Sequence, residues 1–73
     1  MTADEYREAI EALGLTVLSA GRFLDVNERT ARRWANGELS VPPVVAMLLT
    51  LMVKYSISVA EAYELFGQKW NQK

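Results

Sequence analysis

Arginine is the most chemically informative residue type in this chain, because three arginines stand close together in one short stretch. Residues 26–37 read V-N-E-R-T-A-R-R-W-A-N-G, with arginines at 29, 32 and 33, in a chain whose formal net charge is -1 at pH 7. The guanidinium group is always charged, and its planar fork of N–H donors matches phosphate, carboxylate and the guanine edge. The stretch is therefore either a solvated helix face or a surface that meets phosphates and base edges.

Enzyme chemistry has few candidate groups in this sequence. The 73 residues include no cysteine and no histidine. This removes the thiolate nucleophile, the imidazole base and the usual ligands of a soft metal. The carboxylates and arginines that remain form no pair at a recognisable catalytic spacing. We therefore expect no catalytic activity, no metal and no cofactor, and we expect the function to be binding.

The apolar segments carry no targeting or membrane pattern. The amino-terminal M-T-A-D-E-Y-R-E is acidic where a secretory signal would be basic, and no apolar core region follows it. The longest apolar run, residues 41–53, contains Pro42, Pro43 and Thr50 and is shorter than the roughly 20 residues that a bilayer-spanning helix needs. We expect a cytoplasmic protein that does not enter a membrane.

The elements that must position the arginines are all helical. Apolar residues recur at helical spacing, and no alternating strand pattern or internal repeat occurs. A chain of 73 residues is long enough for one domain only, so residues 1–73 are expected to fold as a single all-α compact bundle. We predict about five short helices, at roughly 3–13, 17–24, 28–36, 43–54 and 59–66.

Capping residues and glycines mark the expected helix boundaries. An N-cap side chain accepts a hydrogen bond from the first turn, and a Glu three residues later completes a capping box. Glycine adopts the left-handed conformation that often ends a helix. The expected N-caps are Thr2 and Ser58, which form boxes with Glu5 and Glu61, together with Thr16 and Asn27; the expected terminal glycines are Gly14 and Gly37.

The predicted helix 28–36 has two different faces. Ala31 and Trp34 are spaced to point into the core, with Thr30 at the edge, while the arginines fall on the other sides. In the preceding helix, Gly21 removes a side chain at a position where another backbone could come close. We expect Trp34 to be a core residue and Gly21 to allow close helix packing.

The predicted helix 43–54, P-V-V-A-M-L-L-T-L-M-V-K, has almost no polar face. Its apolar residues could be ordinary core, but three short helices are too few to cover all of them. A second subunit is the simplest cover. We therefore expect a homodimer formed through the helices at 43–54 and 59–66.

The predicted helices 17–24 and 28–36, joined by a turn of about three residues, describe a helix-turn-helix, whose second helix enters the DNA major groove. The stretch L-T-V-L-S-A-G-R-F-L-D-V-N-E-R-T-A-R-R-W-A-N-G-E-L-S-V-P resembles the Cro and lambda-repressor class of phage and bacterial DNA-binding domains. The resemblance covers roughly residues 5–53. The residues that match the pattern of that class are Thr16, Val26, Thr30, Trp34, Gly37 and Pro42.

Three residues depart from the pattern of that class. Val17 stands where the class usually has a glutamine that touches the DNA backbone, so one expected contact is weakened. Gly21 stands where the class has alanine, and Asp25 where it has the glycine of the turn. The last two departures bear on the geometry of the turn.

The resemblance implies site residues on the predicted helix 28–36 and beside it. By the docking mode of the class, Glu28, Arg29 and Arg33 would face base edges and favour G·C pairs. Arg22, Asn27, Arg32 and Asn36 would contact the DNA backbone, which positions a protein without specifying sequence. The acidic residues of the first helix would have to face away from DNA: Asp4, Glu5, Glu8 and Glu11.

The sequence thus predicts a sequence-specific DNA-binding transcriptional regulator of phage or bacterial type whose partner is double-stranded DNA. Simpler interpretations remain for single residues, because Glu28 also suits a helix N-terminus and Asn27 is first of all a cap. The acidic balance and Val17 favour an alternative in which the same fold binds another protein, as an antitoxin-like or phage accessory factor. No small-molecule substrate is expected in either case.

Overall fold

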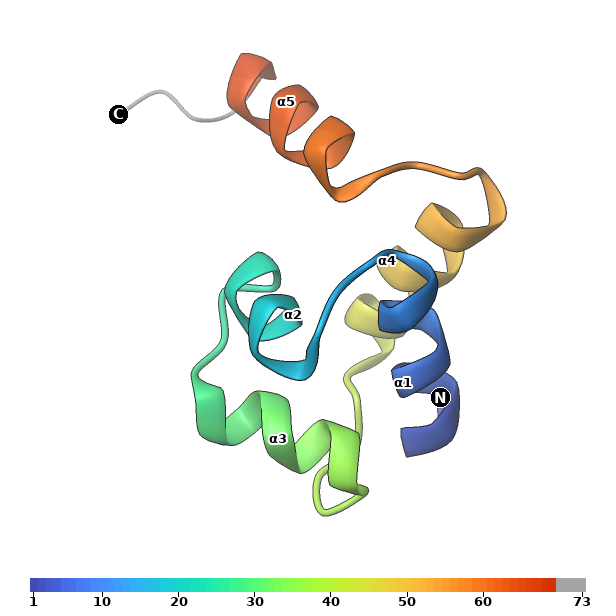
Figure 1. Cartoon of the computed structure of the whole chain (residues 1–73), viewed down its shortest axis with the longest axis vertical. Coiled ribbons are helices and arrows are strands. Elements are labelled where there is room, and N and C mark those ends of the chain that lie inside the picture. The colour runs from blue at the N-terminus through green and yellow to red at the C-terminus, as the bar shows by residue number, and fades with distance from the viewer. Residues whose placement is uncertain (70–73) are drawn as a thin grey trace.

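The computed structural model describes residues 1–69, which form five helices and no strand (Figure 1). The expected all-α class is confirmed, and the first four helices agree with the predicted bounds to within one residue. The last helix continues through Gly67, where the sequence predicted its end, because one helical glycine costs only about 1 kcal/mol. Trp70 lies outside the described residues. The helices are α1 (Ala3–Ala12), α2 (Val17–Phe23), α3 (Glu28–Asn36), α4 (Pro43–Lys54) and α5 (Val59–Lys69).

Side-chain hydrogen bonds cap the helix N-termini at the residues that the sequence predicts. Thr2 and Glu5 form a complete capping box, in which the Glu5 carboxylate accepts the Thr2 backbone N–H and the Thr2 hydroxyl accepts that of Glu5. This pair of bonds lowers the pKa of the Glu5 carboxyl. Thr16 caps α2 in the same manner, with Ser19 as the reciprocal residue. At α5 the Ser58 hydroxyl accepts the Glu61 N–H, which is the N-cap half of the predicted box.

The connections that frame α3 use left-handed residues. Gly37 has φ 78° and ends the helix, as the sequence predicts. Asp25 has φ 58° between α2 and α3, in the left-handed region that favours glycine. A non-glycine residue in this region is uncommon, although Asp tolerates it better than most.

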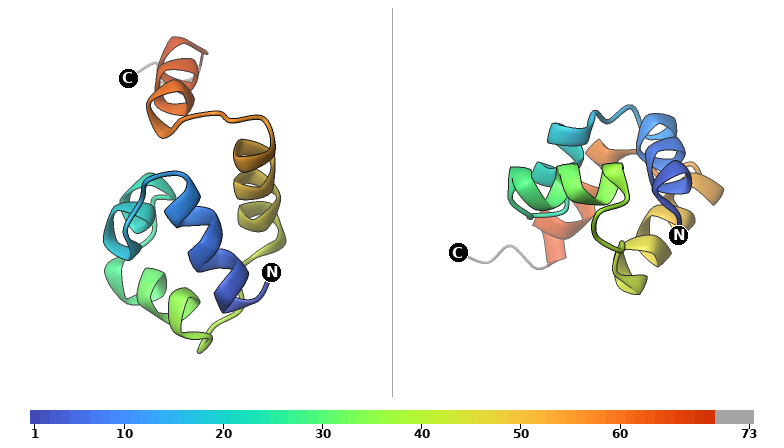
Figure 2. Two further views of the ribbon diagram at one scale, coloured as in Figure 1. Left: turned by 45° about the vertical axis from the view of Figure 1, so that its right-hand side comes forward. Right: turned by 90° about the horizontal axis from the view of Figure 1, so that it is seen from below.

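The core lies between the first four helices. α1 packs on α3 and α4, and α2 packs on α3 (Figure 2). Tyr6 and Trp34 meet edge to face at its centre, with ring centroids 5.9 Å apart. Burial raises the pKa of the Tyr6 hydroxyl, and neither this hydroxyl nor the Trp34 indole N–H has a hydrogen-bond partner among residues 1–69. The buried cluster comprises Tyr6, Ile10, Ala20, Trp34, Ala35, Val41 and Leu49.

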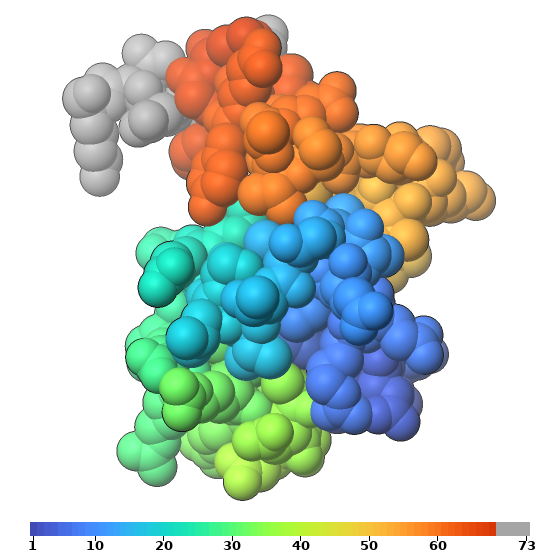
Figure 3. Space-filling model, in the orientation of Figure 1, coloured from blue at the N-terminus to red at the C-terminus, as the bar shows by residue number. Residues whose placement is uncertain are grey.

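α5 lies apart from this core, at the opposite end of the molecule from α3 (Figures 1 and 3). None of its side chains from Val59 to Gln68 is buried, and its clearest contact is the edge-to-face pair of Tyr63 with Phe23 on α2, at 5.3 Å between centroids. The molecule is still a compact globule. Its radius of gyration of 12.1 Å is close to the value of about 11 Å expected for a folded chain of this length.

Within the described residues, no single helix is long and apolar enough to cross a membrane. The stretches Pro43–Lys54 and Val59–Gln68 reach the required length and composition only when taken together, and the chain bends by 113° between them.

Candidate nucleic-acid interface

α3 has a buried face and an exposed face. Ala31 and Trp34 are buried and Thr30 lies at the edge, which confirms the predicted orientation. Ala35 is also buried, and the sequence reasoning did not anticipate this. With these three residues turned inward, the arginines of the helix must lie toward solvent.

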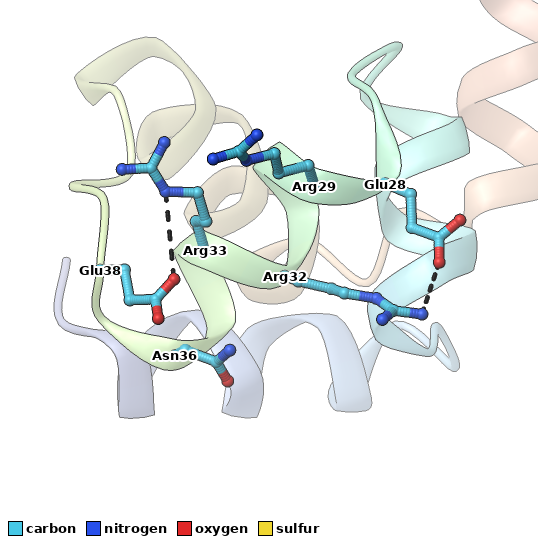
Figure 4. Close-up of a pocket in the computed structure, with 6 residues that line it drawn as sticks. All are labelled: Glu28, Arg29, Arg32, Arg33, Asn36 and Glu38. Atoms are coloured by element: carbon cyan, nitrogen blue, oxygen red, sulfur yellow. Dashed lines mark hydrogen bonds and ion pairs between the residues drawn. The ribbon is translucent and has the colours of Figure 1, made fainter.

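The exposed face of α3 and the loop that follows it form one shallow hollow (Figure 4). The residues that line it are Glu28, Arg29, Arg32, Arg33, Asn36 and Glu38. Five of these six belong to the seven site residues implied by the resemblance. Three arginines against two glutamates leave the hollow with a formal charge of +1. The surface is therefore cationic, but only weakly so.

Two of the three arginines on α3 form ion pairs among the described residues, and the third does not. Arg32 pairs with Glu28 one turn earlier, and both side chains are more than half exposed. The Arg33 Nε lies 4.0 Å from a Glu38 carboxylate oxygen. Arg29 has no ion pair within residues 1–69, and Figure 4 shows its guanidinium group extending away from Glu28 toward the side of Arg33. Exposed pairs of this kind are weak, typically 0 to about 1 kcal/mol, so the arginines remain available to another anion.

Two contacts between helices set the position of α3. A Cβ placed on Gly21 would lie 2.9 Å from the Ala31 Cβ, so the predicted close approach of α2 and α3 at this glycine is confirmed. On the other side, the Arg7 guanidinium of α1 donates to the backbone carbonyl of Ala35 and pairs with Asp4. A cation at the carboxyl end of a helix is favourable because unpaired carbonyl groups gather there.

Two of the implied site residues lie outside the hollow. The Asn27 side chain caps α3 by accepting the Thr30 N–H at 2.7 Å. Arg22 lines a different, largely apolar hollow, beside Phe23 and α5. Of the acidic residues of α1, Glu5 and Glu8 line a separate hollow between α1 and α4, and Asp4 pairs with Arg7.

Sequence reasoning missed two residues that shape this surface, Glu38 and Arg7. The position of Glu38 directly after the helix-ending Gly37 is the signal that could have placed it beside α3. Nothing comparable marks Arg7. Its pairing with Asp4 three residues earlier is local, but its bond to Ala35 spans 28 residues.

Within the part of the chain that the structure describes, no group of three or more His, Cys, Asp or Glu side chains could hold a metal ion. The arrangement offers guanidinium, amide and carboxylate groups to a polar partner. A scan against protein-family models, a search of curated proteins and a search of solved structures each found no match for this chain.

Proposed function

We propose that the protein is a sequence-specific DNA-binding transcriptional regulator of phage or bacterial type, with α3 as the helix that enters the major groove. The observation that carries the proposal is the exposed face of α3, on which Arg29, Arg32, Arg33 and Asn36 line one hollow while Ala31 and Trp34 anchor the helix in the core. We interpret α2, residues 24–27 and α3 as a helix-turn-helix. The close packing at Gly21 and the left-handed Asp25 support this interpretation.

The residues of this surface would have two different roles, contact with bases and contact with the DNA backbone. Arg29 and Arg33 are one turn apart and suit bidentate contacts with guanine, and Glu28 can accept from cytosine once it leaves Arg32. Arg32, Asn36, Asn27 and Arg22 suit the DNA backbone, although Asn27 and Arg22 do not line the hollow. The few cationic groups imply weak binding to DNA of arbitrary sequence and a shallow dependence on salt.

Selection of binding sites from random duplex DNA tests this function. We expect the wild-type protein to enrich a motif, and Arg33→Ala to lose the preference for one base pair in it, a change of about 1 to 3 kcal/mol. Lys54→Ala removes a positive charge from the carboxyl end of α4, outside the hollow, and should keep the motif. Sequencing of the retained DNA at low and moderate salt provides the measurement.

One observation favours the alternative, a protein-interaction module on the same fold. Two of the three arginines in the hollow already face carboxylates, so the surface is only weakly cationic. If neither wild type nor Arg33→Ala enriches any sequence, and both bind DNA equally feebly, the α3 surface is solvated or meets a protein, and the DNA-binding proposal is wrong.

We further propose that the protein is a homodimer formed through α4 and α5. Apolar side chains are exposed along one stripe of α4, at spacings of three and four residues, and Val44 is 77% exposed. The stripe continues into a hollow of about 730 Å³ between α2, α4 and α5, lined by Leu48, Phe23, Tyr63 and Phe66 among others. The stripe comprises Val44, Met47, Leu48 and Leu51 on α4 and Tyr55, the residue that follows the helix.

A second copy fits this surface for two reasons. The surface holds both a projecting apolar helix, α5, and a hollow beside it, and a two-fold interface needs a patch that is complementary to itself. Large apolar side chains are also exposed on both helices, from Val44 on α4 to Phe66 on α5, and exposed apolar patches of this kind mark interaction surfaces. An isolated helix as short as α5 is marginal in water, so cover by a second subunit would also stabilise it.

Leu51→Glu is expected to break this dimer without unfolding the chain, because Leu51 is 51% exposed in the single subunit. The dissociation constant should rise about 30-fold or more, as for the loss of an interface residue worth about 2 kcal/mol. Leu18→Glu on α2, at a site 38% exposed and outside the α4 and α5 surface, is the control. Sedimentation velocity gives the masses, and a monomeric wild type would contradict the proposal.

A further inference from the structure

Glu38 lines the α3 hollow, and none of the proposed DNA contacts involves it. It lies just past the end of α3, where Gly37 turns the chain back. Its backbone N–H donates to the carbonyl of Arg33 at 3.0 Å, and that of Leu39 donates to the same carbonyl at 3.2 Å. The backbone of Glu38 is therefore tied to the residue whose side chain its carboxylate faces.

This arrangement differs from the other ion pair in the hollow. Glu28 and Arg32 are four residues apart on one helix and have side chains that are 60% and 59% exposed, a common form of solvated pair. The Arg33 side chain is 41% exposed and that of Glu38 is 61% exposed, and this pair joins α3 to the loop where the chain turns back. Glu38 therefore approaches Arg33 from the loop, whereas Glu28 and Arg32 belong to the same helix.

The atom that Glu38 approaches is the Arg33 Nε, at 4.0 Å. Figure 4 shows the two terminal nitrogens of Arg33 pointing away from this contact. Those two nitrogens are the fork that can donate to the O6 and N7 atoms of one guanine. A carboxylate on the Nε side attracts that edge of the guanidinium group and favours orientations that leave the fork open.

The charge of Glu38 acts on the same arginine. A carboxylate next to Arg33 partly cancels the positive charge that attracts a phosphate group. Recognition of a guanine edge depends mainly on the geometry of the hydrogen-bond donors, so it is affected less. Weakened phosphate contacts reduce binding to DNA of any sequence. The orientation of the guanidinium group and its reduced net charge therefore both favour contact of Arg33 with a base over contact with the DNA backbone.

We infer that Glu38 is a positioning residue that makes Arg33 a reader of guanine instead of a phosphate contact. The inference rests on the proposed DNA-binding function and adds a determinant of its specificity. It predicts that removal of the carboxylate raises affinity for arbitrary DNA while it lowers discrimination at the base pair that Arg33 reads. If Glu38 had a purely structural role, its removal would not raise affinity for arbitrary DNA while lowering discrimination at one base pair.

Glu38→Gln tests the inference in the site-selection experiment, together with titration of a duplex of unrelated sequence at several salt concentrations. We expect preference at one base pair to fall about fivefold or more. Binding to the unrelated duplex should tighten, and its salt dependence should steepen by up to about 0.9 in log–log slope, the value for one added phosphate contact. Glu11→Gln on α1, outside the hollow, makes the same charge change and should keep the preference.

The double variant Arg33→Ala with Glu38→Gln separates positioning from a direct contact. If Glu38 acts through Arg33, the second substitution removes no further preference once Arg33 is gone. Full preference in Glu38→Gln, with an enriched motif in wild type, would overturn the role of Glu38 and leave the DNA-binding proposal standing. Absence of any motif in wild type would overturn the DNA-binding proposal and the role of Glu38 with it.

Discussion

Replacement of Trp34 by alanine is expected to cost about 3 to 5 kcal/mol of folding free energy, the range for loss of a large buried aromatic side chain. Trp34 is 3% exposed, packs edge to face on Tyr6 and joins α3 to the core cluster. A chain of this length has a total stability of about 4 to 11 kcal/mol. The variant should therefore be largely unfolded or close to it.

Circular dichroism during urea unfolding measures this loss, with all proteins at one concentration because self-association would add stability. Trp34→Phe is the matched control, since it keeps an aromatic ring and removes an indole N–H that has no partner within residues 1–69. It should lose much less stability than Trp34→Ala. Equal losses in the two variants would mean that a phenyl ring cannot replace the indole in this packing.

The substitution Gly21→Ala is expected to destabilise the fold by about 1 to 3 kcal/mol, although alanine favours a helix over glycine by about 1 kcal/mol. The added Cβ would lie 2.9 Å from the Ala31 Cβ. A Cβ cannot rotate away from its own backbone, so α2 and α3 would have to separate. Denaturant unfolding monitored by helicity provides the measurement.

The chain offers a matched control in the same substitution at Gly67. Gly67 lies within α5, and a Cβ there would meet nothing within 4 Å. Gly67→Ala should therefore increase helicity and add up to about 1 kcal/mol of local stability. The two identical substitutions are expected to act in opposite directions. A stabilising effect at both positions would mean that the contact of α2 with α3 yields easily.

The elements of this fold were predictable because their signals are local. Thr2, Thr16 and Asn27 each accept a hydrogen bond from a residue three positions later, so their roles can be read from short stretches of sequence. Ala31 and Trp34 face inward because a helix repeats every 3.6 residues. The end of α5 was predicted wrongly, since a glycine permits a helix to end and does not require it.

The candidate site was only partly predictable for the same physical reason. Five of its residues lie on one helix, so periodicity places Glu28, Arg29, Arg32, Arg33 and Asn36 around a common exposed side. Arg22 belongs to another helix, and the angle between the two helices turns it toward α5. Whether these residues bind DNA remains a prediction that the selection experiment decides.

The sequence by itself determined the helical class, the caps and the two faces of α3, because these depend on contacts within about four residues along the chain. Only the tertiary structure decided that Arg7 reaches the Ala35 carbonyl, that Glu38 lies beside Arg33 and that α5 has no buried side chain. Such features depend on how whole helices cross and where loops return. Those relations arise from the packing of residues distant in sequence, which local patterns do not encode.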